Sequence, residues 1–324
     1  MKILFWGLTK GNVGPANINK GICSHLTDGF YSIKSSGKYV SLLEALWKLL
    51  WSRVVVVSCV SRVGYILVAL GRLLGKKSVY IIHGHHAYES KLNNRAPDYK
   101  GLRWEAYIME HADLLLPVSR KFMIWMQHHY PQYANKTEYI YNGVDERIFN
   151  NQVQSNKSSG TIIAAGGVRA EKNNFPVIDA VEKMQGKGKL RIFGGPIGSI
   201  AGKKYSKFVG RVSNADFLKA MSQSEIFVLN AIFESFSISV FEALACGCSI
   251  LVSEVVGATD LLALEESDVI HDPMDVEEIR RKLEYLMEHP NNSRIRSQFH
   301  AEEWSFAKMV ENLENKCKRL VIME

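Results

Sequence analysis

Residues 226–247, IFVLNAIFESFSISVFEALACG, decide the fold of this chain. The short apolar run at 226–229 predicts a buried strand, and the segment from Ser235 to Ile238 predicts a turn that leads into a helix. Two carboxylates, Glu234 and Glu242, follow the strand eight residues apart. This order of strand, turn and helix is typical of an α/β protein with parallel strands.

The same alternation extends in both directions from this stretch. Strands are predicted in the first half at residues 2–6, 53–59, 78–83, 113–118 and 137–141, and in the second half at residues 161–165, 189–193, 207–209, 226–229 and 249–252. Amphipathic helices are predicted between the strands and at residues 275–288 and 301–320. The fold class is therefore α/β, with two doubly wound, Rossmann-like sheets.

The chain is long enough for two domains. It has 324 residues, of which 47% are hydrophobic and 23% charged, as in ordinary folded proteins. The polar stretch at 150–160 predicts a linker. We therefore expect domains at residues 1–150 and 151–300 that face each other across a cleft, with a final helix at 301–324 that packs back on the first domain.

The five cysteines and the apolar segments indicate the cellular compartment in which we expect the protein. The cysteines are odd in number and have no metal-ligand spacing, which favours a reduced cytoplasm. No apolar segment reaches the roughly 20 uncharged residues that a membrane-spanning helix needs.

Charge is distributed unevenly between the halves. Residues 1–150 have 19 Lys and Arg against 10 Asp and Glu, a charge of +9, and the remainder has 21 against 23, a charge of −2. This asymmetry predicts an anionic partner for the first half, such as a membrane surface or a phosphorylated acceptor, or nucleic acid. A cluster of Leu and Trp at 42–51 suits an interfacial helix, with the core face of a buried helix as the alternative.

The segment that carries Glu234 and Glu242 resembles family 4 of the retaining glycosyltransferases, whose pattern ends in EAxxxG as residues 242–247 do. The resemblance implies the two-domain GT-B architecture and a nucleotide-sugar donor. Backbone N–H groups of Ser235, Phe236, Ser237 and Ile238 would face the donor phosphate, and Glu242 would accept two ribose hydroxyls. Glu234 would bind a hydroxyl of the donor sugar. Ser237 stands where the family usually has Gly.

A second segment, residues 165–172, extends the resemblance with AGGVRAEK. In the family an Arg and a Lys at this place hold the diphosphate, and Lys172 matches the Lys. The family Arg is replaced by Gly167, and Arg169 is its expected substitute. Fixed positive charge stabilises a leaving phosphate when no metal does.

Further matches cover nearly the whole chain. The glycine-rich turn at 7–17 would bring Gly14 to the donor and Asn17 to the acceptor. His83, at the end of a predicted strand, would contact the donor sugar or phosphate. By position, Val212 is expected at the donor and Asn142 at the acceptor.

Absent motifs restrict the alternatives. No Asp-x-Asp or GxxxxGK[ST] occurs, and no carboxylate or Cys with ligand spacing accompanies His85 and His86, so no metal site or cofactor is expected. A GT-B nucleotide-sugar epimerase, an NAD-dependent dehydrogenase without its GxGxxG, and a basic nucleic-acid-binding protein remain as other functions.

The favoured function is hexosyl transfer to a saccharide or polyprenyl-linked acceptor in bacterial surface-polysaccharide synthesis such as capsule or lipopolysaccharide. The pathway rests on analogy within the family. We expect a cytoplasmic enzyme, peripheral on the inner membrane face, that does not bind nucleic acid.

Overall fold

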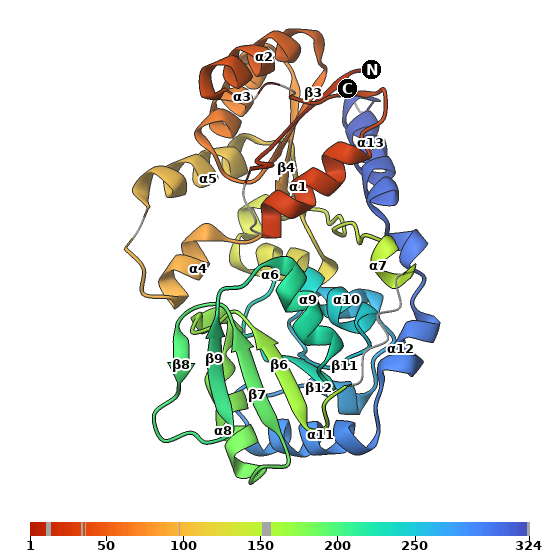
Figure 1. Cartoon of the computed structure of the whole chain (residues 1–324). Helices are drawn as coiled ribbons and strands as arrows, with labels where there is room; N and C mark the ends of the chain where they lie inside the picture. The colour runs from red at the N-terminus through yellow and green to blue at the C-terminus, as the bar shows by residue number, and fades with distance from the viewer. Residues whose placement is uncertain (11–13, 34, 36, 97, 151–156, 323–324) are drawn as a thin grey trace. The chain divides into compact units, whose positions relative to one another are not determined.

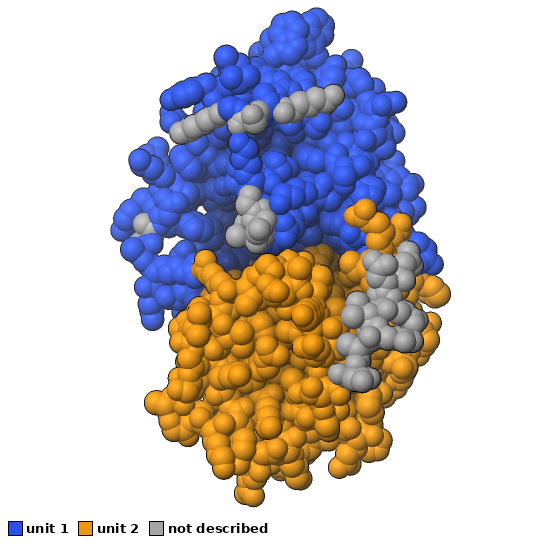
Figure 2. Space-filling model, in the orientation of Figure 1, with its two compact units in different colours: residues 1–145, 301–324 blue, residues 146–300 orange. Residues whose placement is uncertain are grey.

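The computed structural model describes residues 1–10, 14–33, 35, 37–96, 98–150 and 157–322. The chain divides into two compact units (Figures 1 and 2). Unit 1 combines Met1–Asp145 with Ala301–Glu324, and unit 2 is Glu146–His300. No helix of the described part is both long and apolar enough to cross a bilayer.

In its described residues, unit 1 is built on a parallel five-stranded sheet in the order β2-β1-β3-β4-β5. All five residues of β3, VVVVS, are buried because helices cover a parallel sheet on both faces. The strands are β1 (Ile3–Gly7), β2 (Phe30–Tyr31), β3 (Val54–Ser58), β4 (Lys77–Ile82) and β5 (Leu114–Pro117).

The last helix of the chain, α13, packs against the first, α1. A Cβ atom on Gly21 of α1 would lie 2.3 Å from Cζ of Phe306, so only glycine allows this close approach. The helices of unit 1 are α1 (Gly14–Ser24), α2 (Lys38–Trp51), α3 (Arg62–Leu73), α4 (His86–Leu92), α5 (Tyr99–His111), α6 (Arg120–His129) and α13 (Phe306–Ile322), with short 3-10 helices η1 (Pro131–Lys136) and η5 (Ala301–Trp304).

Unit 2 has seven strands in its described part, in the order β12-β11-β10-β6-β7-β9-β8, and only β8 runs antiparallel to its neighbour. Its core contains Ile162, Val181 and Leu283. The strands are β6 (Thr161–Ala165), β7 (Lys189–Phe193), β8 (Ile197–Ser199), β9 (Ser206–Gly210), β10 (Ile226–Leu229), β11 (Ser249–Ser253) and β12 (Val269–Ile270).

Helices α8, α9 and α10 of unit 2 connect strands of its sheet. Helices α8 and α11 pack against each other, and α10 packs against α9 and α12. The helices are α7 (Arg147–Asn150), α8 (Asn174–Lys183), α9 (Asn214–Ser222), α10 (Ile238–Ala245), α11 (Val276–Glu288) and α12 (Asn292–Gln298), with 3-10 helices η2 (Ala170–Lys172), η3 (Gly257–Leu261) and η4 (Glu266–Asp268).

The two doubly wound sheets are confirmed, and one predicted strand, residues 137–141, is wrong. Only an isolated bridge joins Leu115 and Thr137, although the N–H groups of Glu138 and Ile140 donate to the carbonyls of Leu115 and Pro117 at 3.0 Å. Pro117 has no N–H to return a hydrogen bond, so the ladder does not close here.

Three short strands were not predicted, β2, β8 and β12, because they span only two or three residues and lack a long apolar run. The predicted helix at 301–320 is divided at Ser305, whose hydroxyl accepts a hydrogen bond from the N–H of Lys308 at 3.3 Å. Most of the predicted linker, residues 151–156, lies outside the described residues.

Candidate active site

The order of strands in unit 2 identifies one position in its sheet as special. From β6 the chain adds β7 and β9 on one side, and later adds β10 and β11 on the other, so β6 and β10 are neighbours at the point where the order reverses. Ligands of doubly wound sheets bind beyond the carboxyl ends of such strands. The loops that follow β6 and β10 carry the residues of the two motifs.

The loop after β6 is a tight glycine turn. Gly166 and Gly167 have φ values of +98° and +59°. A Cβ atom on Gly166 would lie 2.3 Å from Cγ of Lys172, and one on Gly167 would lie 2.4 Å from the carbonyl oxygen of Gly194. This backbone therefore excludes an arginine at position 167, which is where the family usually has one.

Lys172 and Glu234 meet although they are 62 residues apart. Lys172 Nζ donates to Glu234 Oε2 in an ion pair, and the two side chains are 13% and 12% exposed. The backbone joins the same loops, because the N–H of Ile232 donates to the carbonyl of Glu171 at 2.9 Å. A largely buried ammonium group thus lies beside Glu234, the carboxylate that we expect at the donor sugar.

Arg169 lies on the same loop but is directed differently. Its Nη1 is 3.3 Å from Oε1 of Glu171, its Nε lies 3.4 Å from the carbonyl of Gly166, and its side chain is 46% exposed. The guanidinium is therefore held within the loop and is open to solvent. Contact between Arg169 and a diphosphate stays a prediction.

The turn between β10 and α10 is held in place by η3. The N–H of Gly257 donates to the carbonyl of Glu234, and that of Ala258 donates to the carbonyl of Phe236, at 3.2 and 2.8 Å. The ring of Phe236 is buried against Phe241, 5.6 Å between centroids, so only its backbone is available to a ligand.

Ser237 has φ +80°, a region that favours glycine, and its hydroxyl lies 2.9 Å from that of Ser239. Ser237 therefore carries backbone strain at the first turn of α10, which begins at Ile238. Ser235, directly before Phe236, is buried in this turn.

Glu242 lies one turn into α10 and is half-buried. Burial raises the pKa of its carboxyl, and a hydrogen bond from the Asn214 side chain acts in the opposite direction. Asn214 begins α9, two residues after the exposed Val212. No local pattern in the sequence indicates Asn214, because its partner lies on another helix.

In unit 1, His83 belongs to a hydrogen-bonded chain of three side chains that are far apart in the sequence. Its Nε2 is 2.7 Å from the hydroxyl of Ser58, which donates to Oδ1 of Asn19 at 2.6 Å. Because Ser58 donates to Asn19, it accepts from His83, so Nε2 carries the proton. Burial lowers the pKa of His83 to about 4, and the imidazole is neutral near pH 7. Asn19 and Ser58 were missed by sequence reasoning.

The other residues expected in unit 1 lie in different surroundings. Asn17 is exposed on α1, with Lys20 Nζ 3.5 Å from its Oδ1. Gly14 begins α1, and a Cβ atom added there would meet no described atom within 4 Å. The preceding residues 11–13 lie outside the described part. Asn142 is buried in the segment after η1.

His85 has a structural role: its Nδ1 accepts from the N–H of Tyr88 at 3.2 Å and caps α4. Among the described residues, no group of three or more His, Cys, Asp and Glu side chains is placed to hold a metal ion.

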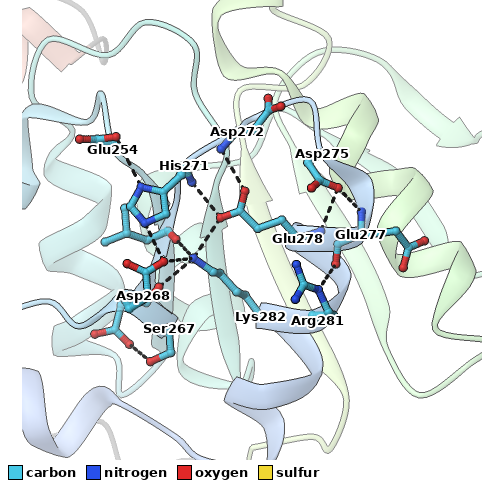
Figure 3. Close-up of polar contacts among 12 residues, drawn as sticks. Glu254, Ser267, Asp268, His271, Asp272, Asp275, Glu277, Glu278, Arg281 and Lys282 are labelled. Atoms are coloured by element: carbon cyan, nitrogen blue, oxygen red, sulfur yellow. Dashed lines mark hydrogen bonds and ion pairs between the residues drawn. The ribbon is translucent and has the colours of Figure 1, made fainter.

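Unit 2 also has a cavity of about 890 Å³ at the start of α11, lined mainly by acidic residues. Several of these side chains form hydrogen bonds and ion pairs that hold the fold together. Glu278 accepts from the N–H groups of His271 and Asp272 at 2.9 and 3.0 Å, and Lys282 Nζ is 3.0 Å from Oε1 of Glu278 (Figure 3). These bonds join α11 to the loop after β12, and they explain the local concentration of charge.

Comparison with solved structures shows similarity over nearly the whole chain. HepE (Alr3699) from Anabaena, solved with UDP, is 14% identical with a TM-score of 0.68, over 98% of this chain and 100% of that one. Sucrose-phosphate synthase from Thermosynechococcus elongatus is 14% identical with a TM-score of 0.69, over 99% of both chains. At this identity the likeness shows the fold alone, which is GT-B. No curated protein matches this sequence.

Two sequence families match consecutive parts of the chain. Residues 22–147 match Glycosyltransferase Family 4, and residues 145–302 match Glycosyl transferases group 1. The second match contains Lys172, Glu234 and Glu242, and the first contains His83. This chain therefore belongs to glycosyltransferase family 4, the retaining hexosyltransferases that take their sugar from a nucleotide-activated donor.

Proposed function

We propose that this enzyme transfers a hexose with retention and without a metal ion, from a nucleotide sugar to a saccharide or lipid-linked saccharide acceptor in bacterial polysaccharide synthesis. The observation that carries the proposal is the pairing of Lys172 with Glu234 at the switch point of the unit 2 sheet. Unit 2 binds the donor, and unit 1 binds the acceptor.

Each proposed donor contact follows from a position in unit 2. Lys172 and Arg169 hold the diphosphate, the N–H groups at the start of α10 approach a phosphate, and Glu242 accepts the ribose hydroxyls. Val212 packs against the nucleotide, and Glu234 binds a sugar hydroxyl. When the donor binds, Lys172 exchanges Glu234 for the phosphate, and Glu234 bonds to the sugar hydroxyl. Neither charged group is then left without a partner.

In the transfer step, the bond between the anomeric carbon and the phosphate oxygen breaks. The acceptor hydroxyl forms its bond to that carbon on the same face, and its proton passes to the departing phosphate. Lys172 stabilises the charge that develops on this phosphate. Neutral His83, with its proton on Nε2 and held by Ser58, contacts the sugar as an uncharged group.

UDP-glucose is the first donor to test, because HepE has been solved with it at 13% identity and a TM-score of 0.67. Incubation with single nucleotide sugars should release nucleoside diphosphate only with the correct one, and release should persist in EDTA. Activity that disappears on chelation and returns with Mn²⁺ would contradict the metal-free mechanism. Conversion of the donor to an epimer without acceptor would instead identify the epimerase.

We also propose that unit 1 binds an anionic membrane surface through α2. Helical spacing gives α2 two apolar faces. One is buried with Ala45 and Leu49, and the other is exposed, with Trp47 at 61% and Trp51 at 62%. The exposed face consists of Tyr39, Val40, Leu43, Trp47, Leu50 and Trp51.

Basic groups lie next to this face. Lys76 Nζ donates to the carbonyl of Leu50 at 3.3 Å, and Arg53 lies two residues beyond the end of α2. An apolar face with Trp and a basic border suits the headgroup region, where each Lys or Arg contributes about 1 kcal/mol. A lipid-linked acceptor would be met at this surface.

The expected result is binding to phosphatidylglycerol vesicles, but not to phosphatidylcholine vesicles, with a steep loss at high salt. Trp47→Ser combined with Trp51→Ser should abolish co-sedimentation, whereas Ile197→Ser, at an exposed residue of unit 2, should not. Failure to bind either type of vesicle would refute the proposal that α2 binds a membrane. A dimer that the double substitution dissociates would assign the face to self-association instead.

A further inference from the structure

Unit 1 contains a groove of about 590 Å³ that includes none of the residues assigned to the donor. It lies between the segment after η1 and the η5–α13 segment. Its lining includes three aromatic and three amide side chains, together with charged residues of both signs: Tyr139, Tyr141, Trp304, Asn142, Asn312, Asn315, Glu138, Glu303, Lys308, Lys316 and Arg319.

One side of the groove is aromatic. The rings of Tyr139 and Tyr141 are 5.1 Å apart, and the ring of Trp304 meets Tyr141 edge-on at 5.3 Å. Tyr139 remains partly exposed. Flat apolar rings at the border of a concave surface offer a face on which the C–H groups of a pyranose can pack.

The other feature is a set of side-chain amides. Asn142 is 5% exposed, and its Oδ1 accepts no hydrogen bond from any described residue. A buried acceptor without a partner is costly, so a donor from a ligand would satisfy it. Asn312 and Asn315 are exposed on α13 and, three residues apart, lie on one side of the helix. Amides bind hydroxyl groups both as donors and as acceptors.

The charges of the groove argue against an anionic ligand. Lys316 Nζ lies 2.5 Å from Oε2 of Glu138, and Arg319 Nη2 lies 2.6 Å from the same oxygen. Lys308 Nζ lies 2.8 Å from Oε2 of Glu311. Each of these three cations already has a carboxylate partner, so the groove offers neutral amides rather than unpaired positive charge.

We propose that this groove binds a neutral sugar ring of the acceptor, at a subsite apart from the donor site. The ring packs on Tyr139, and its hydroxyls bond with Asn142, Asn312 and Asn315. The identification of the ligand as acceptor rests on the proposed function, whereas saccharide binding by the groove does not. Such a subsite would retain a growing saccharide through a unit that does not react.

The test is saturation-transfer NMR on the full chain with UDP present, using maltose, cellobiose, lactose and diacetylchitobiose as probes. At least one probe should bind, and Tyr139→Ala and Asn312→Ala should each weaken its binding about fivefold to tenfold. Both residues are solvent-accessible, so the fold should persist, as circular dichroism would show. Tyr99→Ala and Lys318→Ala, exposed residues of unit 1 outside the groove, are the controls.

The proposal is overturned if no probe binds, or if the groove variants bind as tightly as the controls. A separate assay of nucleoside diphosphate release from the donor, with and without acceptor, distinguishes this failure from failure of the proposed function. Groove variants should keep the unsubstituted donor KM but show an acceptor KM about fivefold to tenfold higher. An enzyme that releases no nucleoside diphosphate from any nucleotide sugar, with or without the saccharide acceptors, yet binds saccharide in the groove would count against the proposed function alone.

Discussion

Replacement of Lys172 by alanine should lower kcat by about 10²- to 10³-fold and change the donor KM much less. Lys172 is 13% exposed and lies on the loop proposed for the diphosphate. Water would therefore compensate little for the loss of its positive charge. Its interaction strengthens as the leaving phosphate gains negative charge, and therefore acts mainly on the transition state. Steady-state kinetics with the identified donor would measure both constants.

Lys183→Ala is the matched control for this substitution. Lys183 also belongs to unit 2 and pairs with a glutamate, Glu277, at 2.7 Å, but its side chain is 54% exposed. Its removal should leave kcat unchanged. A Lys172→Ala enzyme that folds correctly and retains most of its kcat would exclude the leaving-group role.

Replacement of Glu242 by alanine should raise the donor KM about 10- to 100-fold, the value of hydrogen bonds to a charged group, with a smaller effect on kcat. A ribose contact is present in both the ground state and the transition state, so its loss appears in binding. The exposed Glu288 of α11 supplies the control, Glu288→Ala. An unchanged donor KM would exclude Glu242 from the ribose site.

The pKa of Glu242 adds a dependence on pH. Burial raises this pKa, so the carboxyl takes up a proton at a higher pH than an exposed glutamate does. The protonated group accepts fewer hydrogen bonds, so the donor KM of the unsubstituted enzyme should rise as pH falls. In Glu242→Ala this part of the pH dependence should be absent.

The departures from prediction occur where a residue's neighbours come from elsewhere in the chain. Residues 137–141, TEYIY, are rich in the β-branched and aromatic residues of strands, but Pro117 on the adjacent strand removes the donor that pairing needs. Gly167 interrupts the family motif because its backbone passes against Gly194. Neither partner is visible in a local pattern.

The sequence alone determines the α/β class, the two parallel sheets and the family, because strand and helix periods and the motif at 226–247 are local properties. Tertiary structure alone decides which groups meet. It pairs Lys172 with Glu234, links His83 through Ser58 to Asn19, and turns Trp47 and Trp51 of α2 outward while Leu49 is buried. The physical reason is that burial and hydrogen bonding depend on atoms brought together by the sheet order, whereas periodicity depends only on neighbours in the chain.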